Sequence, residues 1–287
     1  MNFFETFINV YRALPGVVKS SVIAAAGHRE IISLRASDRC IIYRSDDPKF
    51  MGPQQITKKI WRVGGSDMTN VRDSAIYLID AGEPVLIDCG SGHGFENTIA
   101  NIREAGFGPD NIAVLVMTHC HADHIGAASL WKSHFGTKLV MHDKDADILE
   151  RGDMRLTAAF CFDVDLKPLP VDMRLQGDAG RLEFTGQLIR WIHTPGHTPG
   201  SISLYMEENA ERVLFAQDIG APLLKEFDCD PKAWLSSIQK LFALEADILC
   251  DGHSGAYGPK HVVKEYLEYC LRAQYQNGYL DTVKNGG

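Results

Sequence analysis

Residues 113–124 of the chain read AVLVMTHCHADH, an apolar run that passes directly into four side chains able to bind a metal ion. The first five residues have the almost continuous apolar character of a strand buried on both faces. His119 and His121 are two residues apart, so in an extended chain they point the same way and can grip one ion. Asp123 and His124 follow at the expected start of a helix, where they can point to a neighbouring ion. Burying so many polar groups costs folding free energy that a bound metal would offset, so this stretch predicts a metal site.

Short strands and helices surround this stretch in two similar series, separated by a region at 151–180 with few regular patterns. In the first series we expect strands at 58–63, 75–79, 84–88, 113–117 and 138–141, with helices at 95–106 and 126–135. In the second we expect strands at 182–184, 188–193, 201–206, 213–216 and 246–250, with helices that begin at Asp230-Pro231 and at Pro259. Two such series predict an α/β fold in which two stacked sheets are flanked by helices and the polar loops meet at one edge.

The bulk composition narrows the class of protein. The chain has 287 residues and a formal net charge of -8, with no Lys/Arg cluster longer than a pair, which argues against a nucleic-acid partner. No apolar run approaches the roughly 20 residues needed to cross a bilayer, so we expect no membrane partner. The seven cysteines are scattered and contain no CxxC pair. They therefore favour a reducing, cytoplasmic location over a disulfide framework.

We expect residues 1–45 to be an N-terminal helical extension, outside a main domain at 46–287. Asn2 can cap its first helix and Pro15 ends it. One face of that helix carries a stripe of apolar residues at helical spacing, namely Phe4, Phe7, Ile8 and Tyr11. Such a stripe is usually covered by the body of the protein, and a homodimer contact or a lid over the active site is the alternative.

The HxHxDH pattern at 119–124 resembles the signature of the metallo-β-lactamase superfamily. Four other stretches resemble the remaining motifs of that family in the same order. They are VLIDCG at 85–90, HTPGHTPG at 193–200, LFAQD at 214–218 and LCDGH at 249–253. The resemblance covers residues from about 58 to 258 and implies an αββα sandwich of two mixed sheets flanked by helices, in agreement with the strand and helix pattern.

The resemblance also implies a set of metal ligands. His119, His121 and His197 would hold the first ion, and Asp123, His124 and His253 the second, with Asp218 bridging both. We expect two divalent ions, zinc first, with iron or manganese as the alternatives, because imidazole and carboxylate ligands suit all three. A hydroxide bridging two cations is available at neutral pH, and Asp123 is the candidate catalytic residue that orients it or passes a proton to the leaving group.

The branch of the superfamily is less sharply defined by the sequence. The presence of Asp218 argues against a true β-lactamase, and the pattern looks like the glyoxalase II-like and lactonase branch. Only 34 residues follow His253, where hydroxyacyl-glutathione hydrolases carry a sizeable helical domain, and Ala221 stands where acyl-homoserine lactonases have a catalytic Tyr. We expect hydrolysis of an ester, thioester or lactone of a small molecule. A mono-iron persulfide dioxygenase and a metal-binding sensor protein with weak turnover remain as alternatives.

Several residues near the motifs receive other roles. We expect Asp88 to hold the metal-binding loops without being a ligand. We expect His193 to be structural and Cys120 to point away from the metals. His28, His93, His134, His142 and His261 lack ligand spacing. The region 151–180 carries Phe160, Phe162 and Leu166, and its place between two metal motifs predicts that it forms an apolar wall of the substrate pocket.

Overall fold

The computed structural model describes residues 51–284. The expected N-terminal extension at 1–45, with its apolar stripe and its boundary to the main domain, lies outside the described residues. The predicted main domain contains all that is described.

The first half of the described chain builds a seven-stranded mixed sheet. Its order follows the sequence: β1 (Gln54–Gln55), β2 (Ile60–Gly64), β3 (Ile76–Asp80), β4 (Pro84–Ile87), β5 (Val114–Val116), β6 (Lys138–His142) and β7 (Met173–Leu175). The pairs from β1 to β4 are antiparallel, and those from β4 to β7 are parallel. The connecting helices are α2 (Phe95–Glu104), α3 (Ala122–Ile125), α4 (Ala128–Phe135) and α5 (Asp143–Arg151).

The second half builds a six-stranded sheet in the order β13 (Gly255–Tyr257), β12 (Ile248–Asp251), β11 (Glu211–Phe215), β10 (Ile202–Glu208), β9 (Gln187–His193) and β8 (Ala179–Phe184). Only β11 and β12 pair in parallel. The helices of this half are α6 (Pro231–Ala243), α7 (Lys260–Gln276) and the short α8 (Asp281–Lys284).

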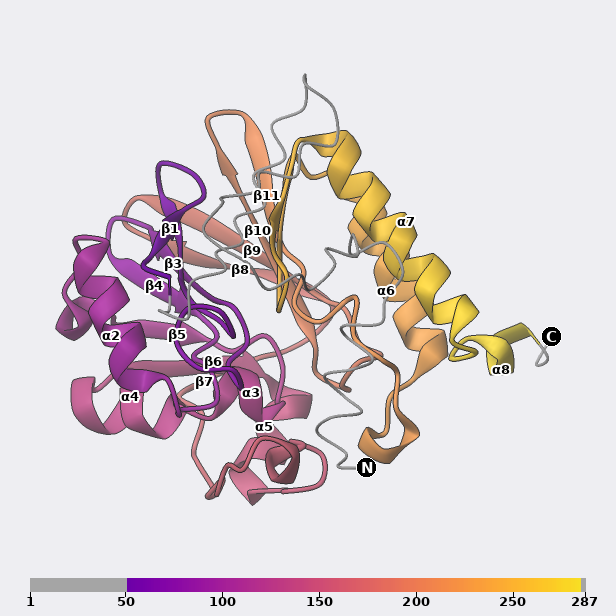
Figure 1. Ribbon diagram of the computed structural model, residues 1–287, viewed down its shortest axis with the longest axis horizontal. Coiled ribbons are helices and arrows are strands. Elements are labelled where there is room, and N and C mark those ends of the chain that lie inside the picture. Colours follow the sequence, from indigo (N-terminus) through magenta and orange to yellow (C-terminus); the bar gives the residue numbers. More distant parts are fainter. Residues whose placement is uncertain (1–50, 285–287) are drawn as a thin grey trace, which may run out of the picture.

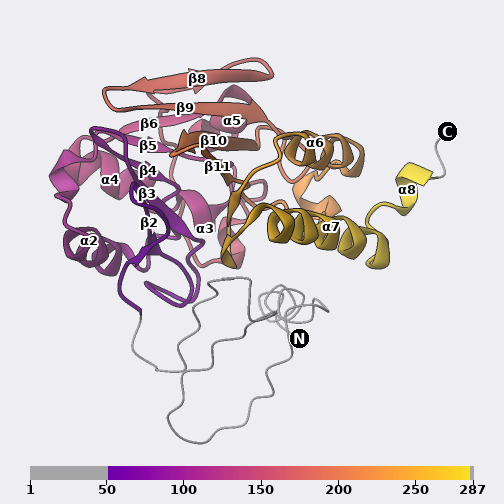
Figure 2. The same ribbon diagram turned by 90° about the horizontal axis from the view of Figure 1, so that it is seen from above.

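The layers follow from where the apolar side chains go. One buried cluster lies between the sheets and joins residues such as Ile79 and Ile87 of the first sheet to Leu204 and Phe215 of the second. A second cluster lies under α2, α4 and α5, and a third under α6 and α7. Figures 1 and 2 show the resulting arrangement, with helices on the outer face of each sheet. The predicted αββα sandwich of two mixed sheets is confirmed.

Besides the short β1 and α8, the sequence did not predict helix α5 or strands β7 and β13. Helix α5 begins directly after β6, and no turn residues separate the two elements in the sequence. Its first turn also contains two aspartates, Asp143 and Asp145. Strands β7 and β13 have three residues each, too few to show an alternating pattern. The irregular region at 151–180 is consequently shorter than expected, because β7 and the start of β8 lie within it.

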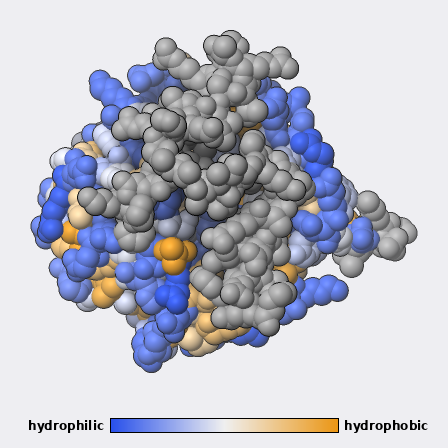
Figure 3. Space-filling model, viewed as in Figure 1, coloured by the Kyte–Doolittle hydropathy of each residue, from blue (hydrophilic) through white to orange (hydrophobic). Residues whose placement is uncertain are grey.

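The described helices were also compared with the length and apolar character of a membrane span. Within residues 51–284, no helix combines the length and the apolar character needed to cross a bilayer. Hydrophilic residues dominate the coloured part of the face in Figure 3, with small hydrophobic patches between them.

Helix α6 begins where the sequence indicated. The Asp230 side chain accepts hydrogen bonds from the backbone N–H groups of Lys232 (2.9 Å) and Ala233 (3.0 Å), and Pro231 occupies the first turn. We expect Asp230→Ala to lower the free energy of unfolding by about 1 kcal/mol, because it leaves two N–H groups of the helix start without that acceptor. Urea unfolding of the metal-free protein measures the change. Asp165→Ala, which removes an exposed carboxylate paired with Lys167, is the control, and equal stability of the two variants would contradict the cap.

Candidate metal centre

The seven ligand candidates lie in four connections between strands and helices that meet at one edge of the sandwich. His119 and His121 follow β5, and Asp123 and His124 belong to α3. His197 follows β9, Asp218 follows β11, and His253 lies between β12 and β13. The structure brings all seven into two adjacent groups, His119–His121–His197 and Asp123–His124–Asp218–His253, in each of which the ligand atoms lie within 4.8 Å of one another. These are the seven residues named as ligands from the sequence, with Asp218, which was expected to bridge both ions, grouped with the second set.

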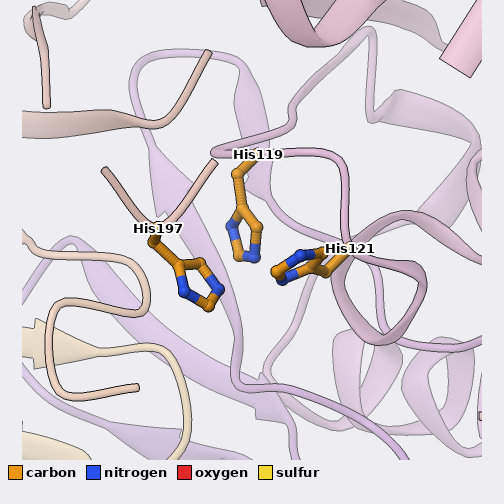
Figure 4. Close-up of side chains that lie close together, drawn as sticks. All are labelled: His119, His121 and His197. Atoms are coloured by element: carbon orange, nitrogen blue, oxygen red, sulfur yellow. The ribbon is translucent and has the colours of Figure 1, made fainter. Parts of the chain in front are cut away.

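The first group consists of three buried imidazoles. The ring centroids of His119 and His121 are 4.9 Å apart, those of His119 and His197 are 4.9 Å apart, and those of His121 and His197 are 4.4 Å apart. Figure 4 shows the three rings pointing toward a common space, two from the loop after β5 and one from the loop after β9. Three imidazoles around one point form a ligand set that zinc and other borderline divalent ions accept.

The second group mixes imidazoles and carboxylates. His253 Nε2 lies 3.1 Å from Asp218 Oδ2 and 3.3 Å from Asp123 Oδ2, and His124 Nε2 lies 3.7 Å from Asp123 Oδ2. The two groups adjoin, because the ring centroids of His119 and His124 are 4.1 Å apart. Two ions could therefore be held side by side.

Asp218 lies between the two groups. Its Oδ2 is 3.5 Å from His197 Nε2 in the first group, and its Oδ1 is 3.1 Å from His124 Nε2 in the second. The His124 and Asp218 atoms do not meet with hydrogen-bond geometry, and both lack a hydrogen-bond partner among the described residues. For comparison, two ligands of one tetrahedral ion with bonds of about 2.1 Å lie about 3.4 Å apart.

Asp88 orients one ligand of each group. Its Oδ2 accepts from His124 Nδ1 (2.7 Å) and from the Thr118 hydroxyl (2.8 Å), and that hydroxyl in turn contacts His119 Nδ1 (3.0 Å). These contacts place the ring proton on Nδ1 in both histidines and leave each Nε2 for a metal. Asp88 has a positive φ of 58°, an unfavourable conformation for a residue with a side chain, as often found at functional sites. It thus takes the supporting position expected from the sequence.

Burial sets the protonation of the first group. It holds the pKa values of His119 and His121 well below their usual range and lowers the pKa of His197 to about 4. All three are therefore neutral imidazoles near neutral pH, which is the form that binds metals.

Charge dominates the second group. Burial acts to lower the pKa of His124, but the carboxylates of Asp218, Asp123 and Asp88 outweigh it and raise that pKa well above its usual value. Burial acts to raise the pKa of Asp218, but His253 and His124 outweigh it and hold that pKa well below its usual range. Burial also raises the pKa of Asp123. A divalent cation could take the place of the protons on these histidines.

Unpaired buried atoms show that the site fits metal ions. Among the described residues, several buried ligand atoms have no hydrogen-bond partner, namely His119 Nε2, His121 Nε2, His197 Nδ1 and Nε2, His124 Nε2, Asp123 Oδ2 and Asp218 Oδ1. Each unsatisfied buried polar atom costs about 1–3 kcal/mol. Coordination to two cations would satisfy both groups, so the donor set and its geometry fit the implied metals.

The other residues singled out in the sequence lie elsewhere. His193 Nε2 contacts the Pro199 carbonyl oxygen (2.9 Å), and its ring stacks on His142 with centroids 4.2 Å apart, so both are structural. Cys120 is buried in the cluster beneath the first sheet, with its Sγ against the Leu156 carbonyl oxygen. His93, His134 and His261 belong to neither ligand group, and His28 lies outside the described residues.

The region after α5 reaches the site in a different way from the one expected. The Thr157 carbonyl accepts from the backbone N–H of Ala122, next to the ligands (2.8 Å). Phe162 is buried in the core cluster beneath the first sheet, where the sequence had predicted a wall of the substrate pocket. Leu166 is buried in the same cluster. Phe160 is 58% exposed and lies against Phe227, whose ring centroid is 5.7 Å from that of His121.

Two neighbours of the ligands, Phe227 and Thr118, were not predicted from the sequence. Phe227 belongs to a short 3-10 turn, Lys225–Phe227, that no periodic pattern announces. Thr118 directly precedes the HxHxDH stretch, and this position is the one sequence feature that could have indicated its contact with the ligands.

Comparisons with known proteins agree with this geometry. Residues 69–253 match the model of the metallo-beta-lactamase superfamily. A hydroxyacylglutathione hydrolase of Haemophilus influenzae is 32% identical over 168 residues, which are 56% of this chain and 76% of that protein. A probable metallo-hydrolase of Bacillus subtilis is 28% identical over 218 residues, 74% of this chain and 93% of that protein.

Solved structures share the fold. A metallo-beta-lactamase from Cronobacter sakazakii, a variant of its HARLDQ motif, superposes with a TM-score of 0.68 at 22% identity, over 82% of this chain and 99% of that one. The enzyme GOB-18 from Elizabethkingia meningoseptica gives a TM-score of 0.66 at 23% identity, over 82% and 93% of the two chains.

Proposed function

The chain belongs to the metallo-β-lactamase superfamily, and from that premise we propose that it hydrolyses an ester, thioester or lactone of a small molecule with two divalent metal ions, zinc first. The observation that carries the proposal is the pair of adjacent, complete ligand groups joined by Asp218. The similarity to metallo-hydrolases, one of them named for a glutathione thioester, supports hydrolysis and includes thioesters among the candidate substrates.

The metals and the protein divide the chemistry. Two divalent ions bound here would polarise the scissile carbonyl and lower the pKa of a bound water toward neutrality. Asp123 is the chain's own group for orienting the attacking water and carrying a proton to the leaving atom, because its Oδ2 is buried among the second group's ligands and has no hydrogen-bond partner there. Phe160, which is 58% exposed and lies against Phe227 next to His121, offers an apolar surface for the acyl part of the substrate.

The same proposal extends to partners and location. The proposed partner is a small-molecule substrate, and neither a nucleic acid nor a membrane is proposed. The net charge of -8 and the lack of a Lys/Arg cluster in the sequence argue against nucleic-acid binding. A reducing, cytoplasmic compartment is supported by six described cysteines that are all free thiols.

We expect the protein to bind two metal ions per chain. Both ligand groups are complete, so protein purified without added metal should contain close to two equivalents in total, by inductively coupled plasma mass spectrometry, and should hydrolyse thioester, ester or lactone test substrates. Removal of the metal with a chelator should abolish turnover, and Zn²⁺ should restore it. One equivalent of iron with persulfide-dependent oxygen uptake would instead assign a dioxygenase, and two metals without turnover would assign a metal-binding sensor.

A further inference from the structure

Asp145 is a fully buried carboxylate close to the metal centre that no motif includes. It lies in the first turn of α5 and is 0% exposed. Its Oδ2 accepts from the backbone N–H of Cys120 (2.9 Å) and from the Thr198 hydroxyl (2.6 Å), and its Oδ1 accepts from the backbone N–H of Gly200 (2.6 Å). All three of these partners are donors, so the site fits a carboxylate.

These three hydrogen bonds join two loops that carry ligands of the same group. Cys120 lies between His119 and His121, after β5 of the first sheet. Thr198 directly follows His197, after β9 of the second sheet. Asp145 thus links the two halves of the first ligand group from a third segment of the chain.

The loop of His197 depends on such support. Both ring nitrogens of His197 lack a hydrogen-bond partner among the described residues, so no hydrogen bond fixes the direction of its ring. The position of the ring is set by the backbone around it, where Thr198 also contacts the Ser201 hydroxyl (2.7 Å). A Cβ atom at Gly200 would lie 2.5 Å from the Asp145 backbone nitrogen, so only glycine permits this close approach.

We propose that Asp145 is a positioning residue that holds His197 against His119 and His121, so that the first ligand group is formed before a metal ion binds. The inference rests on the two-metal centre of the proposed function. The second group does not depend on Asp145, because Asp88 holds His124 and Asp251 accepts from the backbone N–H of His253 (3.0 Å).

Asp145→Asn tests the proposal with almost no change in shape. Whichever way the amide is turned, its NH₂ group faces an N–H donor, that of Gly200 or that of Cys120. Titration of the metal-free protein with Co²⁺, followed by its visible absorption, should show one of two equivalents bound about 10–100-fold more weakly, with the other unchanged. The matched control is Asp147→Asn on the same helix, a carboxylate paired with Arg174 at the surface, which should bind both equivalents as the wild type does.

A second variant and a second background complete the experiment. Thr198→Val removes one of the three hydrogen bonds and should weaken binding of the same metal equivalent by a smaller factor. If circular dichroism shows that the metal-free D145N protein does not fold, the Thr198→Val titration is the test of the positioning role. In a His253→Ala background, which lacks a ligand of the second group, the loss caused by D145N should persist.

The outcomes separate this inference from the proposed function. Wild-type affinity for both equivalents, or an equal loss of both, would overturn the positioning role. Selective loss of one equivalent in a protein whose wild type shows no hydrolysis would support Asp145 and overturn the hydrolase. A wild type that binds no Co²⁺ would overturn both.

Discussion

Replacing Asp218 by alanine is expected to weaken the binding of both metal ions and to reduce kcat/KM for any substrate on the order of 10³-fold or more. Asp218 approaches both groups, with His197 on one side and His124 on the other. Removing it takes a ligand from both ions, and the loss of metal catalysis is worth several kcal/mol, at 1.36 kcal/mol for each factor of about ten.

The Asp218 carboxylate is packed tightly against the neighbouring loop. A Cβ atom at Gly252 would lie 2.1 Å from Asp218 Oδ1, so the backbone of the His253 loop packs directly against this carboxylate. Metal content and steady-state kinetics measure the effect, and Asp178→Ala, which removes a carboxylate that is 95% exposed, is the control. A D218A protein that retains two tightly bound ions would show that the bridge is not needed.

The candidate ligand set could be predicted because most of its residues lie in short sequence motifs next to strands that the sequence also indicates. HxHxDH at 119–124 follows an apolar strand, and the other motifs each end a strand, so the chemistry and the secondary structure mark the same positions. Strand ends on one side of an α/β sandwich meet at one edge, which brings these loops together without further information.

Side-chain direction in the irregular regions could not be predicted in this way. Phe160 and Phe162 are two residues apart in an irregular segment, and only the packing beneath the first sheet decides that Phe162 is buried while Phe160 is exposed. The buried position of Asp145 could not be predicted for a related reason. Its helix was not expected, and an aspartate in a charged stretch, DKDAD at 143–147, is ordinarily read as solvated surface.

Replacing Asp123 by alanine is expected to lower the rate of hydrolysis by about 10²–10⁴-fold, while the fold and the first metal site survive. The Asp123 Oδ2 atom is buried 3.3 Å from His253 Nε2 and has no hydrogen-bond partner, so it is available to the reacting water and to the second ion. The backbone at this position is held independently of the side chain. The Asp123 carbonyl accepts from the N–H of Ser74 (3.1 Å), and the neighbouring Ala122 N–H donates to Thr157 (2.8 Å).

Three measurements separate the chemical role of Asp123 from a structural one. Thermal unfolding of the metal-free variant should match that of the wild type, Co²⁺ titration should show one equivalent retained, and kcat should fall on thioester, ester and lactone test substrates. Asp123→Asn should be nearly as slow as Asp123→Ala, because the amide offers a ligand oxygen but cannot accept and release the proton. Asp110→Ala, a change at an exposed carboxylate in the same half of the molecule, should leave kcat unchanged. Near-normal turnover by D123A would remove Asp123 from the reaction and leave proton transfer to water held between the ligand groups.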